Sequence, residues 1–159
     1  MAGLIWGLLF LIFLPNQALG QDYKRAVGLR LAYGGLMTYK ESLNEQNYLE
    51  GILAIRWGGF EITGLFEYQK DWVDTDLSWY GGAGMHFGVH SRENNFQPSE
   101  EDNETVQINL GMNIIGGVEY VFPSSPFVIS ADYKPSFSFT GSRWFVPEGF
   151  GLSARYIIQ

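Results

Sequence analysis

The chain has 159 residues, of which 46% are hydrophobic and 16% aromatic, and its formal net charge is -7. This length suits one domain, and the negative charge argues against nucleic acid as a partner, because phosphate binding needs clustered Lys and Arg. The chain contains no cysteine, which excludes disulfides, thiolate metal sites and a lipid-modified N-terminal cysteine.

The first predicted element is an export signal. Residues 1–20 carry no charged side chain, and their apolar run over residues 4–14 is shorter than the ~20 residues that a spanning helix needs. They end in Ala18-Leu19-Gly20, which places small residues where a signal peptidase cleaves. We therefore expect a signal peptide over residues 1–20 and one domain over residues 21–159. An uncleaved N-terminal membrane anchor is the alternative.

The rest of the chain consists of short segments in which apolar and polar residues alternate. Successive side chains of an extended chain point to opposite faces, so this period indicates strands with one apolar and one polar face. In residues 106–122 every even position is apolar or glycine, whereas Gln107, Asn109, Asn113 and Glu119 stand at odd positions. The eight predicted strands cover residues 25–34, 36–41, 48–57, 60–69, 79–89, 106–122, 127–134 and 150–158.

The predicted connections differ in length and charge. Gly58-Gly59 is a two-residue hairpin signal, a polar connection covers residues 70–78, and the prolines of residues 123–126 mark a turn. Residues 91–105 form a long loop with five acidic side chains against Arg92. If both termini lie in the periplasm, the extracellular connections are residues 34–35, 58–59, 91–105 and 136–149. The short turn and the 70–78 connection then lie on unexpected sides, because outer loops are usually longer.

The two faces of these strands differ sharply in charge. The apolar face has essentially no charge and carries Phe, Tyr and Trp near strand ends, as in the aromatic girdles of membrane barrels. The polar face has balanced charge, which suits an enclosed space, because an unpaired buried charge loses solvation without compensation. Its charged residues are Arg30, Lys40, Arg56, Lys134 and Arg155 with Glu50, Glu61, Glu67, Glu119 and Asp132.

These patterns predict an all-β fold, a closed antiparallel transmembrane β-barrel of eight strands with a salt-bridge network inside. The signal peptide, the strands and the polar loop, with the phrases "GGVEYVF" (residues 116–122), "ISADYKPSF" (129–137) and "GFGLSARYIIQ" (149–159), resemble the small outer-membrane β-barrel proteins of Gram-negative bacteria, of the OmpA-membrane-domain and OmpX type. The resemblance implies the bacterial outer membrane as the location and insertion by the barrel-assembly machinery. Such chains usually end in Phe or Trp, whereas this one ends in Gln159.

Two segments contain residue types that could support chemistry. His86, His90, Ser91 and Glu93 are the residue types of a hydrolase triad, and some outer-membrane barrels are lipid A deacylases. Adjacent His90 and Ser91 would point to opposite faces of a strand, and the spacing departs from the deacylase pattern. The aspartates of residues 71–76 lack the glycine and the terminal Glu of a calcium loop. We therefore assign no catalytic, cofactor-binding or metal residues.

The function expected from the sequence is that of a small monomeric outer-membrane barrel with a structural or surface-interaction role, and not an enzyme. Its expected partners are membrane lipid and lipopolysaccharide, with an extracellular ligand bound through the loops as a further option. Cation binding by the acidic loop of residues 91–105 is left open. The alternatives are a lipid A deacylase-like enzyme and a soluble periplasmic lipocalin-like binding barrel.

Overall fold

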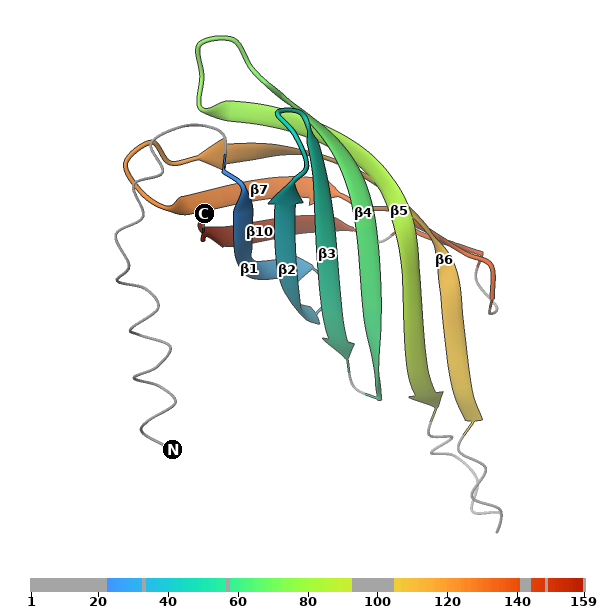
Figure 1. The fold of residues 1–159 in the computed structure, drawn as a ribbon. Coiled ribbons are helices and arrows are strands. Elements are labelled where there is room, and N and C mark those ends of the chain that lie inside the picture. Colours follow the sequence, from blue (N-terminus) through green and yellow to red (C-terminus); the bar gives the residue numbers. More distant parts are fainter. Residues whose placement is uncertain are drawn as a thin grey trace, which may run out of the picture.

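The strands form one closed antiparallel sheet, as Figure 1 shows for the computed structural model, which describes residues 23–32, 34–56, 58–92, 105–140, 144–147 and 149–158. The hydrogen-bonded order is β5-β4-β3-β2-β1-β10-β7-β6, and the ring closes because β5 also pairs with β6. The strands are β1 (Arg25–Ala32), β2 (Gly34–Ser42), β3 (Asn47–Arg56), β4 (Gly59–Asp71), β5 (Leu77–Arg92), β6 (Thr105–Val121), β7 (Phe127–Tyr133), β8 (Ser136–Ser138), β9 (Phe145–Val146) and β10 (Phe150–Ile157).

These ten strands make a ring of eight. β7 pairs with residues 116–121 of β6, and β8 continues along β6 at residues 111–113. β7 and β8 therefore share one position of the ring. β10, which pairs with β7, and β9, which pairs with β8, share the next position. Pro135 separates β7 from β8, because proline has no N–H to give to the ladder. The predicted eight-stranded closed barrel is thus confirmed.

The two ends of the barrel differ. At one end, here called the terminal end, the beginning of β1 and the end of β10 lie beside the turns of residues 43–46, 72–76 and 122–126 (Figure 1). Backbone hydrogen bonds join these segments, including Ile157 N to Pro126 O at 2.8 Å, Val121 N to Asp76 O at 3.2 Å and Gln69 N to Gln46 O at 2.8 Å. At the opposite loop end, the ends of β3, β4, β5 and β6 lie close together, because Gly59 of β4 pairs with both Arg56 of β3 and His90 of β5.

Burial alternates along the strands as the sequence predicted. In β4 the even positions are exposed and the odd positions from 61 to 69 are buried. The buried side chains are largely polar or charged, whereas the exposed ones are apolar: Arg155 is 1% and Lys40 0% exposed, but Leu31 is 68% and Phe150 83% exposed. The barrel therefore has a polar inside and an apolar outside, the reverse of a soluble barrel.

The predicted Gly58-Gly59 turn does not include Gly59, which begins β4 and pairs with Arg56. Three other predicted connections need correction. Gly34 and Gly35 are not a turn but part of β2, where they pair with Ala32 and Leu31. The 70–78 connection is shorter than predicted, because β4 continues to Asp71 and β5 begins at Leu77. Polar residues at these strand ends can stay in the ladder, since they lie outside the apolar band. The connection at the terminal end therefore covers only residues 72–76 and is not the long one predicted from the sequence.

The third correction concerns residues 136–149, which are not a plain loop. β8 and β9 lie within them and form a short antiparallel hairpin, in which Ser136 pairs with Val146 and Phe137 with Phe145. Ring contacts between Phe137 and Phe145, with centroids 5.1 Å apart, accompany this pairing. The predicted loop of residues 91–105 is confirmed only as a connection between strands: Ser91, Arg92 and Thr105 belong to β5 and β6, and residues 93–104 lie outside the described residues.

The predicted signal peptide of residues 1–20 also lies outside the described residues. No helix in the described part of the chain is long and apolar enough to cross a membrane.

Candidate functional site

The lumen holds, nearer its terminal end, five fully buried charged side chains, here called the central charge layer. They come from five different strands and are Lys40, Glu50, Glu67, Glu119 and Arg155. Each stands at an inward-facing position of its strand, alternating with outward-facing apolar residues. Because the sheet is closed, side chains from strands far apart in the ring converge at this level.

Glu119 is the hub of the central charge layer. Its Oε1 accepts hydrogen bonds from Tyr23 Oη at 2.8 Å and Gln69 Nε2 at 3.0 Å. Its Oε2 accepts hydrogen bonds from Lys40 Nζ at 3.2 Å and Arg155 Nη1 at 3.1 Å. The carboxylate therefore joins β2, β4 and β10 to β6 and also binds Tyr23, two residues before β1. Hydrogen bonds to an ionised acceptor are the stronger class, so this hub ties the ring together.

The two basic side chains each bind a second carboxylate. Lys40 Nζ lies 3.0 Å from Glu67 Oε2, and Arg155 Nη2 lies 2.5 Å from Glu50 Oε1. Lys40 Nζ also lies 4.4 Å from the ring centroid of Tyr80, a cation–π distance. Burying these charges costs free energy, and that cost is offset only where each charge has close partners. The partners here lie on other strands, so the layer favours the closed ring.

Two smaller polar groups lie nearer the loop end. Arg30 Nη1 lies 2.5 Å from Asp132 Oδ2, and the same oxygen accepts a hydrogen bond from Tyr80 Oη at 2.9 Å. His86 is buried, and its Nδ1 lies 2.7 Å from Asn113 Oδ1. The polar filling of the barrel thus extends from the central charge layer toward the loop end.

Apolar side chains lie on both sides of the central charge layer. One buried cluster at the terminal end contains Tyr23, Ala26, Tyr48, Val121, Val128 and Ile157. The other lies on the loop side and contains Leu36, Ile52, Ala54, Leu65, Tyr80 and Ile115. Apolar packing therefore accompanies the ion pairs inside the barrel.

The structure describes the side chains of nine of the ten charged residues that the sequence placed in a lumen network. Nine of the ten predicted charges are buried, with exposed fractions of 6% or less. The tenth, Arg56, lies in β3 but its side chain is outside the described part. Lys40, Glu67, Glu119, Arg155 and Glu50 meet in the central charge layer, whereas Arg30 pairs separately with Asp132.

The candidate hydrolase residues are not brought together among the side chains that can be described. His86 points into the lumen toward Asn113, and His90 is half-buried four positions along the same strand. The side chain of Ser91 and the whole of Glu93 lie outside the described residues. A lipid substrate would approach the outer face of the barrel, and His86 is on the inner face.

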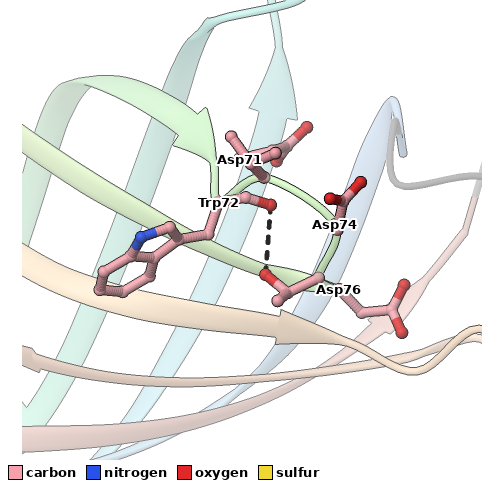
Figure 2. Close-up of a pocket in the computed structure, with 6 residues that line it drawn as sticks. Asp71, Trp72, Asp74 and Asp76 are labelled. Carbon is pink, nitrogen blue, oxygen red and sulfur yellow. Dashed lines mark hydrogen bonds between the residues drawn. The ribbon is translucent and has the colours of Figure 1, made fainter.

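The acidic turn at the terminal end forms an open hollow of about 430 Å³ (Figure 2), lined by residues 71–76. Thr75 Oγ1 donates a hydrogen bond to the Trp72 carbonyl at 3.2 Å, and Asp74 has a φ of 61°, so the backbone turns sharply here. Asp76 points away from Asp71 and Asp74. Across the described ranges, no group of three or more His, Asp or Glu side chains is placed to hold a metal ion.

One important residue of the site was missed by the sequence pattern. Tyr23 precedes the first predicted strand, and its position in the alternation would place it on the outer face with Val27 and Leu29. In the structure the chain bends at Lys24, and the Tyr23 side chain is only 1% exposed. The bend has no signature in the local sequence, so only the contact with Glu119 identifies it.

Comparison with known proteins finds a similar fold in one solved structure. Neither a protein-family model nor a curated protein sequence matches the chain. The fold is similar to the crystal structure of the N-terminal β-barrel domain of Pseudomonas aeruginosa OprF, with a TM-score of 0.62 and 15% sequence identity. The match covers 85% of this chain and 98% of that one. At this identity the likeness concerns the fold, and the chain is accordingly an all-β protein with the closed antiparallel barrel seen in that domain.

Proposed function

We propose that the chain is a small integral β-barrel protein of the bacterial outer membrane. Its role is structural or depends on surface interactions, and it is not an enzyme. The observation that carries the proposal is the reversed polarity of the barrel. Large apolar residues such as Ile62, Met85 and Ile114 are 51%, 55% and 52% exposed on the outer face, while charged residues fill the lumen. Burying this outer face in lipid removes apolar surface from water, which strongly favours the membrane.

An aromatic girdle at the terminal end supports this location. Outward-facing aromatic residues lie within three residues of the strand ends around the ring, and they are Tyr39, Tyr68, Trp79, Tyr120, Phe127 and Tyr156. Their rings contact one another across neighbouring strands, with centroids 6.0 Å apart for Tyr68 and Trp79 and 5.5 Å apart for Phe127 and Tyr156. Amphipathic rings favour the boundary between acyl chains and head groups.

Charged residues on the outer face lie near the level of the aromatic girdle and not in the apolar band. Arg25, Glu41 and Lys70 face outward, and each lies within two residues of a strand end at the terminal end. Arg25 and Glu41 form an exposed ion pair at 3.0 Å. A charge in the apolar band would cost about 2–4 kcal/mol at the bilayer midplane and much less near the interface. The position of these three residues therefore fits the membrane surface.

The proposed partners follow from this placement. Membrane lipid would cover the outer face, lipopolysaccharide would contact the loop end, and the barrel-assembly machinery would insert the chain. The termini would lie in the periplasm, and the loops would offer the surface for any extracellular ligand. One copy of the chain closes the barrel with its own strands, which supports a monomer.

A heat-modifiability gel on isolated outer-membrane fractions tests the proposal. We expect the protein in that fraction, released only by detergent, with different gel mobility before and after boiling, because a closed barrel resists unfolding in detergent. Release into the soluble fraction without detergent would contradict the membrane location and favour a lipocalin-like periplasmic barrel. Hydrolysis of lipid A that His86→Ala and His90→Ala both abolish would contradict the non-enzymatic role.

A further inference from the structure

We propose that Tyr23 is a stopper that closes the lumen at the terminal end. The inference depends on the closed barrel and not on its location in a membrane. Tyr23 is the first residue that the structure describes, and it lies outside the ladder of β1. Its side chain is nevertheless 1% exposed, as deeply buried as the core of the barrel.

The chain departs from strand geometry to place this side chain. In β1 the inward-facing residues Ala26 and Arg30 stand at even positions, so a straight extension would turn Tyr23 outward. The chain bends at Lys24, whose carbonyl accepts a hydrogen bond from Ser42 N at 2.8 Å. This bond holds the bend against the end of β2 and directs Tyr23 across the mouth of the barrel.

The ring of Tyr23 fills the terminal end of the lumen. It packs with the ring of Tyr48 at a centroid distance of 5.7 Å and an interplanar angle of 48°. Val128 of β7, with no exposed surface, and Ile157 of β10 belong to the same apolar cluster. The cluster lies between the central charge layer and the water at this end, so removing one large ring would leave a gap leading to the charges.

The hydroxyl of Tyr23 connects the stopper to the central charge layer. It donates a hydrogen bond to Glu119 Oε1 at 2.8 Å, beside the bond from Gln69. The ring and the hydroxyl therefore have separate tasks: the ring excludes water, and the hydroxyl orients the hub carboxylate. Phenylalanine at this position would keep the first task and lose the second, whereas alanine would lose both.

Cysteine accessibility tests the stopper cleanly, because the chain has no cysteine of its own. A single cysteine replaces Val128 beside the stopper, and its reaction rate with a small water-soluble maleimide is measured on the folded barrel in detergent. Two matched positions serve as controls: Ile129→Cys, which faces outward next to Val128, and Ile115→Cys, which lies in the other apolar cluster. Gel mobility before and after boiling establishes that each variant is folded.

The expected result is that Tyr23→Ala raises the labelling rate of Val128→Cys by about tenfold or more, because loss of a buried ring favours local opening. Tyr23→Phe should leave the rate unchanged, and Ile115→Cys should stay protected in every background. An unchanged Val128→Cys rate in Tyr23→Ala would overturn the proposal, as would equal rises in Tyr23→Phe or at Ile115→Cys. If Tyr23→Ala does not fold, Tyr23→Val takes its place, because valine also leaves a gap. The same labelling results then support or overturn the proposal.

Discussion

Replacing Glu119 with alanine should destabilise the barrel by about 3 kcal/mol or more, because it removes one member of a buried ionic network. The carboxylate accepts hydrogen bonds from Tyr23, Gln69, Lys40 and Arg155, and alanine would leave all four donors with one partner fewer. Lys40 and Arg155 would each keep a second carboxylate, Glu67 or Glu50, so the barrel should still form.

The measurement is the melting temperature of the folded barrel in detergent, followed by gel mobility. A loss of this size corresponds to a decrease of about 10 °C for a chain of this length. Glu41→Ala is the matched control, since it breaks an exposed ion pair with Arg25 and should leave the melting temperature nearly unchanged. Glu119→Gln should fall between the two. An unchanged melting temperature in Glu119→Ala would mean that Glu119 faces water.

Gly84→Ala should destabilise the folded barrel more than Glu119→Ala, because there is no space for a methyl group at this inward-facing position of β5. An added Cβ would lie 1.8 Å from the Gly64 carbonyl oxygen and 2.8 Å from Leu65 Cα on the neighbouring strand. Both are backbone atoms of the ladder and cannot rotate away. Overpacking typically costs about 1–3 kcal/mol, and a clash with backbone should exceed that range.

Gly64→Ala is the matched control for this prediction. Gly64 lies across the same strand pair but faces outward, and an added Cβ there meets nothing within 4 Å. We expect Gly64→Ala to fold with a nearly unchanged yield and melting temperature. Gly84→Ala should give little or no heat-modifiable protein in refolding into detergent or vesicles. Equal refolding of the two variants would contradict the close approach of β4 and β5 at this level.

The location of the charges could be read from the sequence, because a strand has a simple period of two. Glu119, Arg155 and Lys40 each stand at polar positions of an alternating pattern, and the period alone places them on the same face of the sheet. The two-faced composition then indicated which face is enclosed. This reasoning needed no knowledge of which strand lies opposite which.

The pairing of those charges could not be read in the same way. Lys40 lies directly opposite Glu50 in the β2–β3 register, yet its Nζ contacts Glu67 and Glu119, while Glu50 binds Arg155. The long side chains cross the lumen, and their partners depend on the tilt and closure of the whole ring. The alternating pattern predicts the face on which a charge lies, whereas the closure of the barrel determines its ion-pair partners.

Local departures from the strand period were also beyond the sequence. The bend at Lys24 turns Tyr23 inward, and the interruption at Pro135 divides one position of the ring into β7 and β8. The predicted strand ended at Lys134, and nothing in the sequence indicated that the chain would rejoin β6 directly after Pro135 through the pairing of Ser136 with Asn113. Such features depend on contacts with other strands, so the local sequence carries little trace of them.

The central claim is that the apolar outer face meets lipid, and spin labels on β6 test it most directly. Labels at Ile114 and Val118, which are 52% and 39% exposed, are compared in lipid vesicles with a label at Asn44 in a turn at the terminal end. We predict frequent collisions with oxygen and few with a water-soluble nickel complex at Ile114 and Val118, and the reverse at Asn44. Collisions with nickel at Ile114 and Val118 as frequent as those at Asn44 would contradict the account.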